Sequence, residues 1–167
     1  MNSRLGRQVY FFGEWMDAGA SAGGLNAQCK DFENNSGCAL LDFGYRSVME
    51  NVLLNNSTMN DLANYLTARE SYWKNPLKQV VFLDNHDMPR INTVLRAVGR
   101  MDENYAPKRT DLGLALTMTV RGVPCIYYGT EQYAANFTSN SCGQQGSDPY
   151  NREMMPSFNT NTSAYSI

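Results

Sequence analysis

Two absences narrow the classes of protein to which this sequence of 167 residues can belong. No apolar run approaches the roughly 18 residues that suggest a membrane span. The 14 Lys and Arg are interspersed with 16 Asp and Glu, and no basic run occurs. A chain without a basic stripe cannot displace counterions from a phosphate backbone. We therefore expect neither a membrane nor a nucleic acid as a partner.

Histidine and cysteine are scarce, with one His and four Cys. Cys29 and Cys38 flank a short polar loop and could close a disulfide. Cys142 lies in a second polar loop, and the sequence leaves the pairing of these three residues open. Cys125 stands inside an apolar run, which predicts a small core residue. Residues 1–7 contain no apolar signal region, so we expect no signal peptide in this chain.

What the sequence does contain is an alternation of short apolar runs with segments of helical periodicity. The length predicts a single domain over residues 1–167. The order strand, helix, strand, helix, strand, helix, strand predicts parallel βα units, and the nearly continuous apolar strands indicate a sheet covered on both faces. Strands are predicted at residues 9–13, 39–43, 80–83 and 124–129, and loops at 18–37 and 88–105.

The helical segments each show an apolar face and, in one case, a start signal. Thr58 followed by Asp61 resembles a capping box and predicts the start of the second helix. Pro107 suits the first turn of the third helix, which Gly122 and Pro124 end. The predicted apolar faces are Val48, Met49, Val52 and Leu53 in the first helix, Leu62, Tyr65 and Leu66 in the second, and Leu112, Ala115, Leu116 and Thr119 in the third.

Polar residues follow the apolar runs at the points where the strands should end. They are Glu14, Asp42, the segment 85–87 and the segment 130–132. In a β/α barrel the active site is built at the carboxyl ends of the strands. The pattern alone predicts half a barrel, or a small open sheet, with a site at the strand tips.

Glu14 ends the first apolar run beside Trp15, and it has two interpretations. A carboxyl group in apolar surroundings is suited to donate a proton. A surface Glu that merely ends a strand is the more ordinary interpretation, and these neighbouring residues alone favour it.

Asn85, His86 and Asp87 crowd an amide, the one histidine and an acid onto one strand end, directly after Asp84. All three side chains can donate to or accept from sugar hydroxyls. A carboxylate here could hold two hydroxyls of one ring and respond to its distortion. A structural role for this His is an equally good interpretation of the residues by themselves.

Together, these segments resemble successive motifs of the α-amylase family. Residues 12–15 (Phe-Gly-Glu-Trp), 82–87 (Phe-Leu-Asp-Asn-His-Asp) and 122–132 are similar to the ends of barrel strands five, seven and eight, and residues 40–43 to strand six. Residues 148–152 and 156–158 resemble the loop after strand eight in cyclodextrin glucanotransferases and maltogenic amylases. The resemblance implies the C-terminal half of a (β/α)8 TIM barrel that acts on starch-like α-1,4-glucans.

The resemblance also implies a role for each matching residue. Glu14 would be the general acid/base and Asp87 the transition-state stabiliser. His86, with Asn85 beside it, would bind the same sugar. Trp15 and Met16 would shape the acceptor side, where glucanotransferases favour an aromatic at the position of Met16, so transfer and hydrolysis both stay open. Asp148 and Arg152 would hold glucose units toward the non-reducing end. The family's calcium site falls largely outside this sequence, so we expect no metal and no cofactor.

A second carboxylate is missing from the resemblance. A retaining glycosidase needs a nucleophile about 5–5.5 Å from the acid/base, and the family places it at the end of strand four, before residue 9. Gly44–Val48 imitates the family's G-x-R-x-D pattern, but Val48 stands where the Asp belongs. Two hypotheses follow: a fragment of a retaining glycosidase or glucanotransferase, or an incomplete half-barrel that at most binds maltooligosaccharides.

Two further expectations concern the surroundings of the protein. A half-barrel has open strand edges, which invite pairing with another chain, so we expect a homodimer or a larger assembly. The starch-directed function implied by the resemblance predicts an extracellular parent protein.

Overall fold

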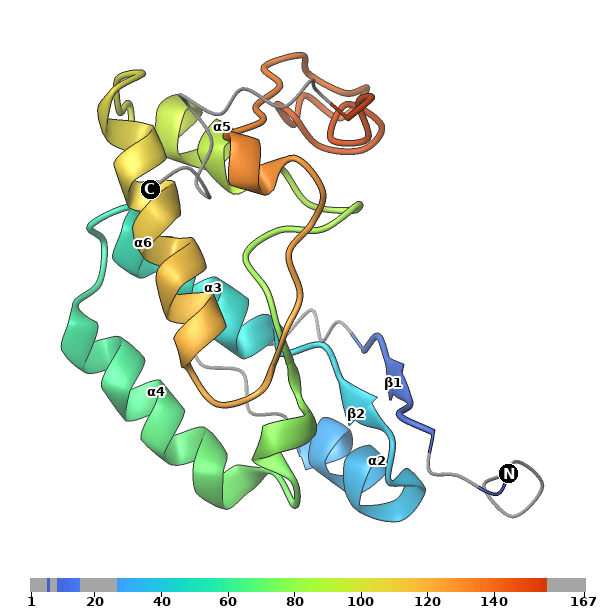
Figure 1. The fold of residues 1–167 in the computed structure, drawn as a ribbon. Helices are drawn as coiled ribbons and strands as arrows, with labels where there is room; N and C mark the ends of the chain where they lie inside the picture. Colours follow the sequence, from blue (N-terminus) through green and yellow to red (C-terminus); the bar gives the residue numbers. More distant parts are fainter. Residues whose placement is uncertain (1–5, 7–8, 16–26, 156–167) are drawn as a thin grey trace.

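A computed structural model describes residues 6, 9–15 and 27–155 of the chain (Figure 1). Helices and short strands alternate along the described residues, with two single-turn 3₁₀ helices, η1 and η2. In chain order they are β1 (Phe12–Gly13), α2 (Ala27–Ser36), β2 (Ala39–Leu40), α3 (Phe43–Leu53), α4 (Met59–Tyr72), η1 (Pro76–Lys78), β3 (Val80–Val81), α5 (Ile91–Ala97), α6 (Tyr105–Thr119), β4 (Val123–Pro124) and η2 (Thr130–Gln132).

The strands run parallel, as the alternation with helices predicts. β1 pairs with β2 and β3 pairs with β4, each in parallel register. A parallel bridge between Leu41 and Val80 joins the two pairs, so the strands lie side by side in chain order. The first three predicted strands are therefore confirmed, although each is shorter than its apolar run, whereas β4 meets the fourth predicted strand, residues 124–129, only at Pro124.

Helices α3, α4 and α6 lie together on one side of the strands (Figure 1). Their contact faces supply most of the main core, with the β3 residues Val81 and Leu83 on the strand side. Gly113 of α6 permits this close packing, because an added Cβ would meet the side chains of Leu53 and Leu83 at about 3 Å. The predicted apolar faces of α3 and α4 are confirmed, and Leu66 is partly buried.

The start of α4 is capped as the sequence predicts. The Thr58 side chain accepts from the Asp61 N–H, and the Asp61 side chain accepts from the Thr58 N–H at 2.8 Å. These reciprocal bonds satisfy two backbone donors that the first turn of a helix leaves free.

Three predictions about the helices were wrong. Helix α2 occupies much of the predicted loop at 18–37, and α5 occupies part of the predicted loop at 88–105. In α6 the buried side is turned from the predicted one, since Leu112, Ala115 and Thr119 are exposed. The face that packs inward includes small and polar residues, which a search for apolar periodicity overlooks: Ala106, Thr110, Gly113, Leu114 and Thr117.

The cysteine predictions also fail in the structure. In the part of the chain that the structure describes, no disulfide joins Cys29, Cys38 or Cys142, so the suggested bridge between Cys29 and Cys38 is absent. Cys29 instead packs in a small apolar cluster with Leu40 and Trp73. Cys125 is exposed rather than a core residue, because it follows β4 at the open side of the sheet. Among the described residues, no helix combines the length and the apolar character that crossing a bilayer requires.

Asp42 is a buried structural acid, although the sequence groups it with the polar residues at strand ends. It caps α3 by accepting from the Tyr45 N–H at 2.9 Å, and it also accepts from the Tyr65 hydroxyl. Its other oxygen lies 2.9 Å from Nε of Arg69, and both side chains are almost fully buried. Burial raises the pKa of Tyr45 to about 12 and raises that of Tyr65 further.

Candidate active site

Three of the predicted site residues converge although they come from distant parts of the chain. Glu14 follows β1, whereas His86 and Asp87 follow β3. One ligand atom from each of the three lies within 4.8 Å of those of the other two, and all three side chains are exposed. The parallel strands explain the meeting, because their carboxyl ends lie at the same edge of the sheet.

Asp87 is held by its neighbours on both carboxylate oxygens. Its Oδ2 lies 3.2 Å from Nε2 of His86, and its Oδ1 accepts from the Arg152 guanidinium at 2.9 Å. Its backbone N–H donates to Oδ1 of Asn85 at 2.9 Å. This arrangement fixes the direction in which the carboxylate can meet a ligand.

Arg152 joins the loop after η2 to the cluster of Glu14, His86 and Asp87. Besides binding Asp87, its Nε lies 2.7 Å from Oδ1 of Asp148 and donates to the backbone carbonyl of His86 at 3.0 Å. Arg152, predicted as a binding residue, therefore lies directly beside Asp87, and Asp148, also predicted, is joined to Asp87 through Arg152. The partly exposed guanidinium retains surface that a ligand can contact.

Asn151 is a positioning residue that sequence reasoning missed. Its side chain is fully buried, and its amide donates to the backbone carbonyls of Asn85 at 3.2 Å and Met88 at 2.7 Å. These two bonds bracket His86 and Asp87. The only sequence signal is its place next to Arg152 within a motif, because an isolated Asn usually lies at the surface.

We expect Asn151→Asp to destabilise the fold by about 2–3 kcal/mol. The substitution removes two donated hydrogen bonds and sets a carboxylate against two buried carbonyl oxygens. Chemical denaturation of the wild type and the variant measures the loss. Asn60→Asp, at an exposed position of α4, is the control and should stay within about 0.5 kcal/mol of the wild type. Equal stabilities of the two variants would remove the positioning role.

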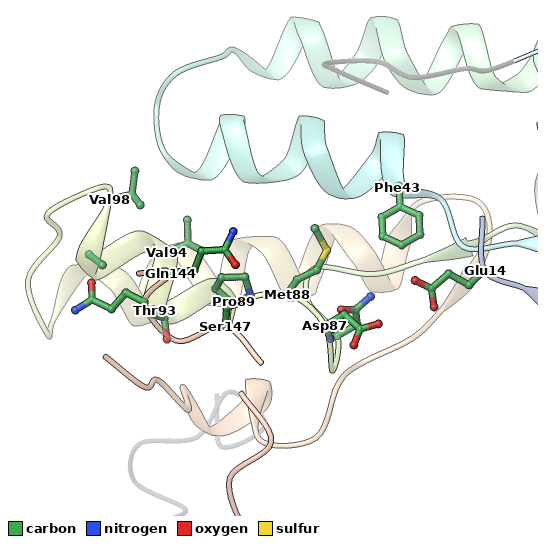
Figure 2. A pocket seen from close by; sticks show the side chains of 13 residues that line it. Glu14, Phe43, Asp87, Met88, Pro89, Thr93, Val94, Val98, Gln144 and Ser147 are labelled. Atoms are coloured by element: carbon green, nitrogen blue, oxygen red, sulfur yellow. Dashed lines mark hydrogen bonds between the residues drawn. The ribbon is translucent and has the colours of Figure 1, made fainter. Parts of the chain in front are cut away.

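A groove of about 570 Å³ opens at Glu14 and Asp87 (Figure 2). Glu14 and Asp87 lie toward one end of it, below Phe43, and Val98 lies at the other end. Met88, Pro89 and Val94 give it apolar surface, and the segment 144–147 adds amide and hydroxyl groups. The volume is within the range of about 300–1,000 Å³ typical of small-molecule sites.

Trp15 does not line this groove, although its neighbour Glu14 does. It contacts the ring of Phe32 from α2, with ring centroids 5.7 Å apart, and lines a separate open pocket beside that helix. The tryptophan therefore faces a different part of the surface from the Asp148 and Arg152 side of the cluster. Met16 lies outside the described residues.

Glu14, His86 and Asp87 are also the group of potential metal ligands that the described residues bring together. One imidazole and two carboxylates are a donor set that divalent cations such as Zn²⁺ accept. The exposure of all three side chains and the contact of His86 Nε2 with Asp87 suit a polar ligand equally well. The expected absence of a metal remains a prediction.

The chemistry open to this cluster follows from its two carboxylates. Glu14 has no hydrogen-bond partner among the bonds made by the described residues, so its carboxyl group is available to a ligand. Asp87 is held by Arg152 and His86, which orients its carboxylate in the groove. Ligand atoms of Glu14 and Asp87 lie within 4.8 Å of each other, so both carboxylates can contact one bound group.

Parallel βα units with polar residues gathered at the carboxyl ends of the strands are the arrangement of a β/α barrel. Residues 7–165 match the family model of the alpha amylase catalytic domain. The chain belongs to the alpha-amylase catalytic-domain family, whose fold is a (β/α)8 barrel.

Two relatives show how much of such a protein the chain represents. It is 52% identical to the cyclomaltodextrin glucanotransferase of Klebsiella oxytoca over 98% of its own length, and 41% identical to that of Bacillus licheniformis over 96%. It spans 27% of the first relative and 20% of the second.

Solved structures give the same picture. CldA, described as a cyclomaltodextrin glucanotransferase with a three-domain ABC distribution, superposes with a TM-score of 0.79 at 36% identity, covering 98% of this chain and 30% of that one. The gamma-CGTase of alkalophilic Bacillus clarkii gives a TM-score of 0.72 at 39% identity, covering 94% and 20%.

Proposed function

We propose that this chain is the C-terminal half of the catalytic barrel of an enzyme that cleaves or transfers α-1,4-glucosidic bonds in starch-like glucans. It supplies barrel strands five to eight with their helices. The observation that carries the proposal is the meeting of Glu14 with Asp87, which Arg152 ties to Asp148. The relatives named as cyclomaltodextrin glucanotransferases support the substrate class.

In this proposal Glu14 performs the proton transfers. Its carboxylic acid gives a proton to the glycosidic oxygen as the bond to the leaving sugar breaks. The resulting carboxylate then takes a proton from water or from the hydroxyl of an acceptor sugar. Its unoccupied carboxyl group at the mouth of the groove supports this role.

Asp87 stabilises the distorted sugar between these two steps. A carboxylate held by His86 and Arg152 can accept hydrogen bonds from two adjacent hydroxyls of one ring, which strengthen as positive charge develops on that ring. His86 and Asn85 contact the same sugar. Asp148 and Arg152 bind glucose units toward the non-reducing end, and Trp15 shapes the acceptor side.

The nucleophile comes from a barrel strand outside this sequence. Among the described residues, no third acid joins Glu14 and Asp87 in the groove. The same observation favours a second candidate function: the chain by itself binds maltooligosaccharides without cleaving them. The segment Gly44–Val48, which imitates the family's nucleophile pattern, lies in the first turns of α3, and Val48 is part of the core.

We expect Asp87→Asn to lower kcat by about 10²–10³-fold, because a transition-state contact contributes mainly to kcat. The measurement is made on a protein that joins this chain to barrel segments carrying the nucleophile. Calorimetry with maltoheptaose on the 167-residue chain should show a much smaller change in affinity. A large loss of affinity with kcat intact would assign Asp87 to ground-state binding.

We also propose that the parent protein is extracellular, as its starch-directed function implies.

We further propose that the chain associates with a second copy in solution. Tyr10, Phe11 and Phe12 are each more than 40% exposed along the β1 edge, and both β4 residues are exposed. Exposed apolar strand edges invite pairing. Light scattering should give a dimer or larger species, which Phe12→Lys shifts toward monomer. A monodisperse 18.7 kDa wild type would contradict this.

A further inference from the structure

The groove extends well past the residues that the proposed chemistry uses. Glu14 and Asp87 lie toward one end, and Figure 2 shows Pro89, Val94 and then Val98 successively farther from them. Gln144, Gln145 and Ser147 line this far part from the loop that follows η2. The proposed catalysis gives no role to this far part of the groove.

The loop that lines the far part, residues 137–147, is anchored to helix α5. The backbone N–H of Asn136 donates to Oγ1 of Thr93 at 2.9 Å, and the Arg96 guanidinium lies 4.6 Å from the centre of the Phe137 ring. An added Cβ at Gly146 would collide with Thr93, so this position requires glycine. The loop is therefore held directly against the groove wall.

The loop is also closed by its own hydrogen bonds. Asn140 Oδ1 accepts from the backbone N–H groups of Cys142 and Gln144 at 3.0 and 2.9 Å, and an antiparallel bridge joins Ser139 to Gln145. Asn140 further contacts the carbonyl of Asp148 at 3.4 Å. This last contact connects the loop to the segment that carries Arg152.

The two glutamines present different groups to the groove. Nε2 of Gln145 donates to the carbonyl of Phe137 at 2.9 Å. The side chain of Gln144 makes one long contact, in which its Oε1 accepts from Nδ2 of Asn140 at 3.4 Å. Within the described part of the chain no bond uses Nε2 of Gln144, so this amide can donate to a ligand. In Figure 2 the Gln144 side chain lies beside Val94, next to Pro89 and Ser147.

We infer that the loop 137–147 and helix α5 form an additional binding position for the α-glucan chain, with Gln144 as its specificity-determining residue. The inference rests on the proposed function and extends it. A glucose unit has apolar C–H faces and a rim of hydroxyls. The apolar faces can pack against Val94, Val98 and Pro89. The hydroxyls can form hydrogen bonds with the Gln144 amide and the Ser147 hydroxyl. The groove is continuous with the catalytic cluster, so one chain occupies both.

The test compares the affinities of maltotriose and maltoheptaose for the 167-residue chain by calorimetry. The wild type should bind the longer sugar more tightly. Gln144→Ala should weaken maltoheptaose binding about two- to tenfold, the value of one or two hydrogen bonds, and leave maltotriose unchanged. Val98→Trp, which narrows the far end from an exposed position, should have the same selective effect. Asn60→Ala, an exposed amide on α4, should change neither.

The outcomes separate the inference from the proposed function. Equal affinities of the two sugars in the wild type, or unchanged length dependence in Gln144→Ala and Val98→Trp, would overturn the additional position while glucan binding stands. Failure of both sugars to bind at all would overturn the proposed function together with the inference. A loss confined to maltoheptaose supports both.

Discussion

Glu14→Gln should reduce the rate of starch cleavage by about 10²–10⁴-fold, the usual contribution of a positioned general acid/base. The amide keeps the size of the side chain but can neither give a proton to the glycosidic oxygen nor take one from water. Because Glu14 is exposed and makes no structural contact among the described residues, stability should stay within about 0.5 kcal/mol of the wild type. The assay is reducing-sugar release by a protein that joins this chain to the nucleophile-bearing barrel segments.

The leaving group provides the control for this prediction. Fluoride leaves α-maltosyl fluoride without being protonated. Formation of the glycosyl-enzyme intermediate from this substrate should therefore be nearly unaffected in Glu14→Gln, whereas starch cleavage should be strongly impaired. Equal losses on the fluoride and on starch would show that the substitution damages the site generally. Equal, non-zero rates of the wild type and the variant on starch would show that the activity arises elsewhere.

The sequence could predict where the polar site residues lie, because in a parallel sheet the carboxyl ends of all strands lie at the same edge. Once residues 12–13 and 80–81 form parallel strands, the side chains that follow them lie along one edge of the sheet. The convergence of Glu14 with His86 and Asp87 needed no further information. The roles of the three residues came from the resemblance to a family and not from that geometry.

The same rule could not separate catalytic from structural polar residues. Asp42 and Thr130 also follow strands, yet Asp42 binds Arg69 from α4, and the Thr130 hydroxyl donates to buried Asp84 at 2.8 Å. Burial raises the pKa of Asp84, and hydrogen bonds from the Ile91 N–H and from Thr130 oppose the effect. Such partners are distant in sequence, and only the folded packing of the helices brings them together.

Helices α2 and α5 escaped prediction for a local reason. Residues 27–36 contain few apolar residues and bury only Cys29 and Glu33, so no apolar stripe marks this helix. Residues 91–97 form a helix of only two turns, in which Asn92 and Thr93 are buried beside Ile91. Hydrophobic periodicity cannot predict a helix whose buried face carries polar residues.

Arg69→Met should destabilise the chain by about 3–5 kcal/mol, the cost of leaving one member of a buried ion pair without its partner. Asp42 would remain buried at the start of α3, and the carbonyls of Arg121 and Pro76 would each lose a donor. Urea denaturation measures the change. Arg121→Met breaks an ion pair with Glu70 whose arginine is largely exposed, and it should cost no more than about 1 kcal/mol.

A second substitution distinguishes the buried charge from lost packing as the cause. Asp42→Asn in the Arg69→Met background removes the uncompensated charge, while its amide oxygen can still accept from the Tyr45 N–H that caps α3. Part of the lost stability should therefore return, because breaking a buried pair costs more than replacing both of its members. If Arg69→Met costs no more than Arg121→Met, or if the double variant is less stable than Arg69→Met, the buried ion pair is not what anchors α4 to the strand end. In that case the orientation of β2 beside the catalytic cluster must depend on the apolar core alone.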